Sequence, residues 1–148
     1  MRKQFQFEVL TEWQKGVQIN SKTHTSKIVG KPDLQISAAR EFKGEASKHN
    51  PEDLLLSALS SCHMMSYFYV CQQNNIDILD YKDLATGILE LKEDSSGGFI
   101  EVILNPVITL RDNQQKEWAL QLHKKAHELC FIANSVNFPI KIIPIINN

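Results

Sequence analysis

The sequence predicts one α+β domain over residues 1–148. Its length of 148 residues matches the commonest size of a single domain, about 100 to 150 residues. Apolar and polar residues alternate in the N-terminal third, and two apolar runs flank a glycine-containing loop within residues 84–104; both patterns are typical of β-strands. Two segments, residues 50–75 and 112–130, instead combine a helix-starting residue with apolar residues at helical spacing.

The first strands are short and are separated by turn residues. "WQKG" at residues 13–16 supplies one turn, and the stretch from Gly30 to Pro32 supplies a break before the last strand of this group. We therefore expect a small meander here. The apolar members of its strands are Phe5, Phe7, Val9, Val17, Ile19, Ile28, Val29, Leu34 and Ile36.

Later strands should follow the first helix and close the chain. Residues 84–104 predict a hairpin, because two apolar runs flank a glycine-containing loop. Pro106 favours an edge position or a bulge, since proline cannot donate to a strand ladder. The final apolar run "FPIKIIPII", residues 138–146, suits an edge strand for the same reason.

The first helix should begin at Asn50 and end near residues 72–75. Asn50 is a good N-cap, Pro51 suits the first helical position, and Glu52 with Asp53 places negative charge at the positive end of the helix dipole. Apolar residues then occur on nearly every side, so we expect this helix to be central and buried. They are Leu54, Leu55, Leu56, Leu59, Met64, Met65, Phe68 and Val70.

The second helix should begin near Asp112, with Gln115 as its capping-box partner. Its apolar residues recur at helical spacing up to Cys130, which lies at the C-terminal end. They are Trp118, Leu122, Ala126 and Leu129.

Composition excludes several classes of function. The net charge is −1 and the 16 basic residues are scattered, so we expect neither a nucleic acid nor a membrane partner. No stretch approaches the roughly 18 uncharged apolar residues that a membrane-spanning helix needs, and no leader sequence is evident. We therefore expect an unprocessed cytoplasmic protein. Three cysteines without a C-x-x-C motif argue against a static disulfide scaffold in a reducing cytosol.

The three cysteines differ in what they can bond. Cys62 and Cys71 lie nine residues apart, about 13.5 Å along one helix, which is too far for a disulfide. Cys62 and Cys130 lie on different helices, so nothing forbids their pairing. The alternative is that all three are inert, because buried free cysteine usually acts as a small hydrophobic residue.

Reactivity would require a positive neighbour, because a free thiol with a pKa near 8.5 is only a few per cent ionised at neutral pH. The chain has three arginines, Arg2, Arg40 and Arg111. A guanidinium about 4 Å from a thiolate contributes roughly 4 kcal/mol at an effective dielectric near 20. Glu52 is a candidate for the carboxylate that would orient such an arginine.

The pattern of these residues resembles the OsmC/Ohr family of thiol-dependent hydroperoxide reductases. Asn50-Pro51-Glu52 is followed by Cys62, which lies 10 residues after Glu52 and 22 after Arg40, and by Cys130, 68 residues later. The resemblance covers most of the chain. It implies an OsmC-like α+β fold, with curved antiparallel sheets around a long buried central helix in an intertwined homodimer.

The same resemblance implies a chemistry and a set of site residues. Cys62 would attack an organic hydroperoxide as a thiolate, Cys130 would resolve the resulting sulfenic acid as a disulfide, and Arg40 with Glu52 would activate Cys62. No metal or bound cofactor is implied, and the reductant would be a dithiol such as dihydrolipoamide or a lipoylated protein. Arg40 is similar in position to the arginine of the OsmC branch, since the Ohr branch takes its arginine nearer the N-terminus. The family's Pro-x-Ser after the second cysteine is replaced here by "CFIANS", so we expect a different turn at Cys130.

Helix geometry itself suggests a dimeric site. Glu52 and Cys62 would lie about 15 Å apart along one straight helix, so a single chain does not easily place both in one site. Two copies crossing antiparallel near Ser57 would bring Glu52 of one chain beside Cys62 of the other. Small residues at 57, 58, 60 and 61 would allow the close approach.

Histidines next to the cysteines offer alternative roles. His63 follows Cys62 directly, but adjacent helical residues diverge by about 100°, so we expect it to pack or hydrogen-bond elsewhere rather than act as the thiol's base. A zinc site built from Cys62, His63, His127 and Cys130 is the weaker alternative, because the usual ligand spacings are absent. Two hypotheses therefore stand: a cysteine-based peroxidase, and a non-catalytic OsmC-like protein that binds a small hydrophobic ligand at the dimer interface.

Overall fold

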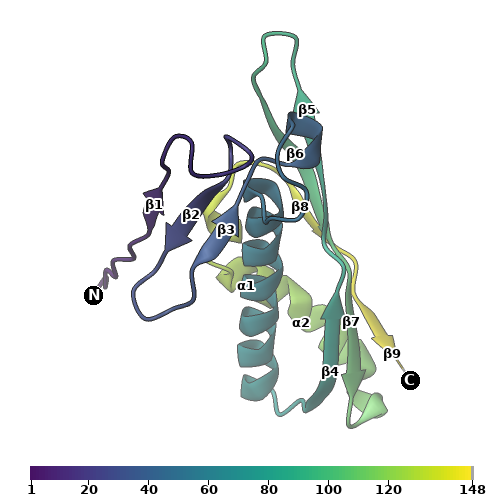
Figure 1. Ribbon diagram of the computed structural model, residues 1–148. Helices are drawn as coiled ribbons and strands as arrows, with labels where there is room; N and C mark the ends of the chain where they lie inside the picture. Colours follow the sequence, from purple (N-terminus) through teal and green to yellow (C-terminus); the bar gives the residue numbers. More distant parts are fainter. Residues whose placement is uncertain (148) are drawn as a thin grey trace. The chain divides into compact units, whose positions relative to one another are not determined.

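A computed structural model describes residues 1–147, and its helices and strands are labelled in Figure 1. The chain divides into two compact units, residues 1–55 and residues 56–148, and the division falls inside the first long helix. One domain for the whole chain stays a prediction.

The first unit holds the predicted meander. Its elements are β1 (Leu10–Glu12), β2 (His24–Lys27), β3 (Leu34–Ile36) and the 3-10 helix η1 (Arg40–Phe42). The three strands pair antiparallel in the order β1-β2-β3. Trp13 Nε1 donates to the carbonyl of Ser21 at 2.8 Å, which closes the connection between β1 and β2.

Several apolar residues of this unit do not lie in strands, contrary to prediction. Phe5, Phe7 and Val9 precede β1 and are exposed, because no neighbouring strand pairs with them among residues 1–147. Val17 and Ile19 lie in the long turn between β1 and β2. Ile28 and Val29 fall in the next turn, which is closed by a 3.1 Å bond from Lys31 N to Ile28 O around Gly30 at φ 77°.

The second unit combines most of the long helix with two small sheets. Its elements are α1 (Pro51–Gln73, from residue 56 onward), β4 (Ile78–Asp83), β5 (Thr86–Leu91), β6 (Gly97–Leu104), β7 (Pro106–Leu110), η2 (Asn113–Gln115), α2 (Lys116–Leu129), η3 (Ala133–Ser135), β8 (Ile140–Ile142) and β9 (Ile145–Asn147). The strand orders are β4-β7-β9 and β5-β6-β8. The predicted hairpin over residues 84–104 is confirmed as β5–β6, which begins at Thr86.

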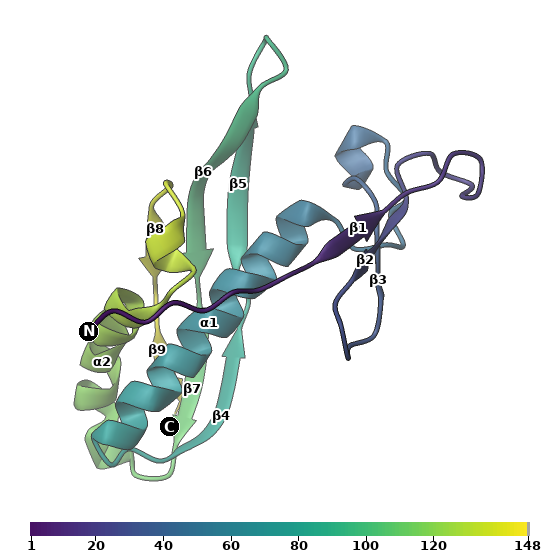
Figure 2. The same cartoon turned by 90° about the vertical axis from the view of Figure 1, so that its left-hand side faces the viewer.

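The two sheets form one continuous bent surface, because each strand of one runs directly into a strand of the other (Figures 1 and 2). The bend passes through residues 84–85, Asn105 and residues 143–144. Asn105 stabilises it: its backbone N–H donates to Asp83 Oδ1 at 2.6 Å, and its side chain donates to Leu84 O at 3.0 Å. Curvature is therefore built from a break in all three strands.

Two strand predictions need correction. β8 and β9 do lie at sheet edges as expected, but they pair parallel to β6 and β7, so the sheets are mixed rather than wholly antiparallel. Pro106 begins β7, which is the central strand of its sheet and not an edge. Proline is tolerated there because it is the first residue of the strand, ahead of the ladder that β9 forms from Val107 onward.

The start of α1 is confirmed, whereas α2 begins at Lys116, after a 3-10 turn that starts at the predicted position. Asn50 Oδ1 accepts the backbone N–H of Asp53 at 2.8 Å, as an N-cap should. Asp112 Oδ1 likewise accepts the N–H of Gln114 at 3.0 Å, although the first turn is the 3-10 helix η2. Gln115 is not a capping-box partner: its side chain donates to the carbonyl of Asn75 at 3.3 Å.

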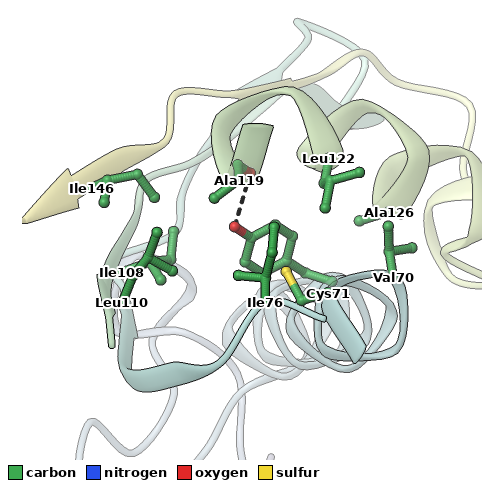
Figure 3. Packing of buried hydrophobic residues seen from close by; sticks show 10 residues of the cluster. Val70, Cys71, Ile76, Ile108, Leu110, Ala119, Leu122, Ala126 and Ile146 are labelled. Atoms are coloured by element: carbon green, nitrogen blue, oxygen red, sulfur yellow. Dashed lines mark hydrogen bonds between the residues drawn. The ribbon is translucent and has the colours of Figure 1, made fainter. Parts of the chain in front are cut away.

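The core of the second unit lies where both helices meet β7 and β9 (Figure 3). Tyr67 of α1 is fully buried at its centre, and its hydroxyl donates to the carbonyl of Ala119 on α2 at 2.9 Å. This bond satisfies the one polar group that the aromatic ring carries into the core. The other members are Val70, Cys71, Ile76, Ile108, Leu110, Ala119, Leu122, Ala126 and Ile146.

Helix α1 is buried on one side only, so the prediction of a wholly buried central helix does not hold for the single chain. Its buried residues are Leu59, His63, Tyr67, Val70 and Cys71. An opposite stripe, which we call the α1 outer face, is exposed at helical spacing; its members are Ser57, Ser61, Met65, Phe68 and Tyr69.

The composition of α1 also departs from expectation. One 18-residue window has a mean hydropathy of 1.3, which by length and composition alone is enough for a membrane span, and 28% of it is buried. The prediction that no segment has such a composition is therefore wrong. Core helices of soluble proteins pass the same test, so this property does not distinguish the two classes.

Candidate active site

Two of the predicted site residues lie together in the second unit. Cys62, midway along α1, is partly exposed, and Cys130, the C-cap of α2, has 0% of its surface exposed. Both thiols are free. Burial raises the pKa of Cys130 to about 11, and the adjacent Cys62 side chain contributes to this increase through a hydrogen bond. The structure thus forms a dithiol pair with one accessible sulfur and one enclosed sulfur.

The turn after α2 encloses Cys130. Its sulfur accepts the backbone N–H of Ala133 at 3.4 Å, and its carbonyl accepts the N–H of Asn134 at 3.0 Å. The Asn134 side chain returns to the carbonyl of Glu128 at 3.0 Å, and the Ser135 hydroxyl donates to Phe131 O at 2.8 Å. The polar residues of "CFIANS" therefore build a compact turn that holds the thiol in place.

Cys71 has the properties of a structural residue. It is 1% exposed within the core of the second unit, and burial raises its pKa to about 11. A thiol that stays protonated is a poor nucleophile. This supports the interpretation of Cys71 as a space-filling residue.

Arg40 and Glu52 belong to the first unit, so their pairing with Cys62 stays a prediction. Arg40 is 81% exposed at its side chain and lies 3.9 Å from the carboxylate of Glu41. Glu52 lies in the first turn of α1, and its Oε2 is buried without a hydrogen-bond partner among residues 1–147. A buried carboxylate oxygen without a donor is costly, which favours a cationic partner for Glu52 in an assembled site.

His63 packs into the protein as predicted. Its Nε2 lies 3.0 Å from His123 Nδ1 on α2, and the two rings are stacked with centroids 5.3 Å apart. The Tyr67 ring also stacks on the His123 ring, with centroids 3.8 Å apart. Burial lowers the pKa of His63 to about 4 and that of His123 to about 3. Both imidazoles are therefore neutral at physiological pH.

A second polar contact fixes α1 next to Cys62. The Ser60 hydroxyl donates to Asp83 Oδ2 at 2.6 Å, while Asp83 Oδ1 accepts the backbone N–H of Asn105. Asp83 thus joins the helix to the bend of the sheet. Because Ser60 precedes Cys62 by two residues, this carboxylate sets the position of the helix at the dithiol pair.

Metal ligands are not grouped around the cysteines. Across the described part of the chain, no set of three or more histidine, cysteine, aspartate or glutamate side chains is arranged to hold a metal ion. His63 and His123 form a pair, and their remaining nitrogens lack a partner within residues 1–147.

Comparison with known proteins identifies the family. A family model described as OsmC-like protein matches residues 44–144, which is more than half of the chain. The chain belongs to the OsmC-like protein family. No curated protein matches it.

Solved structures agree on the fold. An OsmC-like protein of unknown function from Vibrio cholerae is 26% identical to this OsmC-like protein, with a TM-score of 0.82 over 96% of this chain and 100% of the other. An organic hydroperoxide resistance protein from Elizabethkingia anophelis is 19% identical, with a TM-score of 0.75 over 100% and 99%. One from Legionella pneumophila is also 19% identical, with a TM-score of 0.69 over 98% and 100%.

Sequence reasoning missed three residues of this OsmC-like site: Ser60, Asp83 and His123. Ser60 gave a signal, because a hydroxyl within an otherwise apolar helix needs a partner. Asp83 and His123 gave none, since their partners lie on elements far away in the sequence.

The histidine pair predicts a loss of stability in mild acid. The unfolded chain protonates near pH 6.5, whereas the folded pKa values are about 4 for His63 and about 3 for His123. Between these limits the unfolded state binds more protons, so the free energy of unfolding falls as pH decreases from 6.5 toward 4. The expected slope is about 1.4 kcal/mol per pH unit for each histidine, measured by urea unfolding at several pH values.

Two variants test the origin of this slope in the OsmC-like chain. His123→Phe keeps a ring against Tyr67 and should roughly halve the slope, because only His63 then contributes. His49→Gln, which alters an exposed histidine, should leave it unchanged. An unaltered slope in His123→Phe would assign the acid sensitivity to other groups.

Asp83→Ala should destabilise the protein by about 1–3 kcal/mol, because it leaves the Ser60 hydroxyl and the Asn105 N–H partly buried without their acceptor. Urea unfolding at pH 7 measures the change. Asp80→Ala, on the exposed side of the same strand, should stay within about 0.5 kcal/mol of the parent protein. Equal stability of the two variants would show that the Asp83 contacts contribute nothing.

Proposed function

We propose that this OsmC-like protein is a cysteine-based peroxidase that reduces organic hydroperoxides. The observation that carries the proposal is the dithiol pair, in which the partly exposed Cys62 adjoins the enclosed Cys130. Two structural neighbours named organic hydroperoxide resistance proteins share the fold and support this choice of substrate.

The cycle would proceed in two steps at this pair. The Cys62 thiolate attacks the outer oxygen of the hydroperoxide, the O–O bond breaks, and the departing alkoxide takes a proton and leaves as an alcohol. Cys62 is thereby oxidised to a sulfenic acid. The sulfur of Cys130 then attacks Cys62, a disulfide forms and water is released. An external dithiol, such as dihydrolipoamide or a lipoylated protein, would reduce the disulfide and complete the cycle.

Activation of Cys62 would come from Arg40, oriented by Glu52. A guanidinium beside the sulfur stabilises the thiolate by direct charge attraction, and a carboxylate holds the guanidinium in a bidentate geometry. The buried, partnerless Oε2 of Glu52 supports this assignment, because it needs such a donor.

We further propose a homodimer, in which a second copy covers the α1 outer face. Three large apolar residues of that face are 57%, 39% and 56% exposed: Met65, Phe68 and Tyr69. A contiguous apolar face of this kind marks an interaction site. The small residues Ser57 and Ser61 continue it, which supports the predicted antiparallel crossing near Ser57 and the supply of Glu52 to the partner's cysteine.

Turnover with a defined peroxide tests the proposed activity. The protein is mixed with cumene hydroperoxide and dihydrolipoamide, and the loss of peroxide is followed together with the number of free thiols. A peroxidase consumes peroxide catalytically and loses two thiols per chain when the reductant is omitted. If Cys62 remains free after treatment with peroxide, the protein is not a peroxidase and the alternative of a ligand-binding protein is favoured.

A further inference from the structure

The dithiol pair is asymmetric, and this asymmetry determines how its disulfide can be reduced. Cys62 is partly exposed on α1, whereas Cys130 has no exposed surface behind the turn formed by residues 131–135. We infer that the external thiol attacks the sulfur of Cys62 and that Cys130 is the leaving group. This inference rests on the proposed peroxidase cycle. The reductant is therefore carried on Cys62 as a mixed disulfide.

The accessibility of the two sulfurs favours attack on Cys62. Thiol–disulfide exchange requires the incoming thiolate to reach the sulfur that it attacks, and the rate depends on which sulfur is reachable. Cys130 is 0% exposed, and its sulfur contacts the Ala133 N–H and the Cys62 side chain. A reductant cannot reach it while the turn is folded. Cys62 is open to the same approach that a hydroperoxide would use.

The pKa of the departing sulfur affects the rate of this step, because a thiol of lower pKa leaves faster, and here two effects oppose each other. Burial raises the pKa of Cys130 to about 11, which makes a free thiolate unfavourable. The backbone N–H groups of Ala133 and Ile132 lower this pKa and stabilise developing negative charge on the sulfur. The high pKa has the larger effect, so the departing sulfur accepts a proton as it leaves. The turn blocks an incoming thiol from Cys130 but does not prevent the bond between Cys130 and Cys62 from breaking.

The thiolate of the reductant forms a bond to Cys62 Sγ, the bond between Cys62 and Cys130 breaks, and the electron pair of that bond goes to Cys130, which takes the proton released when the attacking thiol ionised. With a dithiol, the second thiol then attacks the reductant's own sulfur. A cyclic disulfide is released, and Cys62 returns to its reduced state.

The test uses an oxidant other than peroxide, so that its outcome is independent of peroxidase activity. Protein carrying Cys71→Ser is oxidised with diamide, which links neighbouring thiols, and is then mixed with excess 2-mercaptoethanol by quenched flow. Acid stops the reaction, N-ethylmaleimide labels free thiols, and peptide mass spectrometry locates both groups. We expect the mercaptoethanol adduct on Cys62 and the maleimide on Cys130, with a preference of roughly tenfold or more.

Three outcomes would overturn the inference: an adduct mainly on Cys130, equal adducts on both cysteines, or failure of diamide to link the pair. A second measurement covers the case in which the adduct is too short-lived to trap. In the Cys71→Ser background, Cys130→Ser leaves Cys62 as the single thiol and Cys62→Ser leaves Cys130. The Cys62 protein should react with Ellman's reagent at least roughly tenfold faster, and similar rates would refute the access argument. Failure of peroxide turnover with normal adduct formation would reject the proposed function and leave this result standing.

Discussion

Cys62→Ser is expected to abolish peroxide consumption, which is the largest effect predicted for any single substitution. A serine hydroxyl is not ionised at neutral pH and is a far weaker nucleophile than a thiolate, so the first step of the proposed cycle cannot occur. The rate of loss of cumene hydroperoxide, measured with dihydrolipoamide present, should fall to that of a sample without protein.

Two further cysteine variants show whether the loss of activity is specific to Cys62. Cys71→Ser should retain full activity, because Cys71 is 1% exposed and lies apart from the dithiol pair in the hydrophobic core. Cys130→Ser should still consume one equivalent of peroxide and then stop, with Cys62 left as a sulfenic acid that dimedone traps. Equal activity of Cys62→Ser and the parent protein would contradict the assignment of Cys62.

Arg40→Met is expected to give the second largest effect. A guanidinium about 4 Å from the sulfur contributes roughly 4 kcal/mol before desolvation is subtracted, which is enough to keep the thiol ionised. Without it the thiol would be only a few per cent ionised at neutral pH, so the reaction with peroxide should slow by up to roughly 30-fold. Much of the rate should return at alkaline pH, where the thiol ionises without assistance. A profile of alkylation rate against pH measures both effects.

Arg111→Met is the matched control for this substitution. Arg111 forms an exposed ion pair with Asp77 at 2.5 Å, so its removal should leave the alkylation profile unchanged. If Arg40→Met and Arg111→Met behave alike, Arg40 does not activate Cys62, and another cation or the helix itself must do so.

The parts of the fold that could be predicted are those specified by local sequence. Asn50 caps α1 and Asp112 caps the following helical turn because each side chain bonds to a backbone N–H within three residues. The β5–β6 hairpin could likewise be predicted, since its loop and its two apolar runs are contiguous. Cys62 and Cys130 could be identified as a possible pair, because they lie on different helices and helix geometry does not forbid a disulfide between them.

Other features depend on contacts between distant segments, which sequence patterns do not encode. The parallel pairing of β8 with β6 joins Ile140 to Val102, and nothing in either segment specifies direction. Alternation around Phe5 and Phe7 resembles a strand, yet pairing needs a neighbour that residues 1–147 do not supply. The contact between His63 and His123 spans 60 residues and became evident only from the packing of α1 on α2.

The exposed side of α1 shows a different limit of sequence reasoning. Apolar residues on every side predicted burial, and the single chain buries only the side of α1 that carries Tyr67 and Val70. A helix carries apolar residues on each face that is buried in the assembled protein, including faces buried between chains. The same residues that contradict burial in one chain are therefore the ones that support a dimer.

The most direct test of the dithiol mechanism is mass spectrometry after one equivalent of cumene hydroperoxide. The protein is treated without reductant, alkylated, digested and mapped. The proposed mechanism predicts a single new crosslink between the peptides that contain Cys62 and Cys130, with Cys71 alkylated. Recovery of both cysteines in alkylated form, or a crosslink through Cys71, would contradict it.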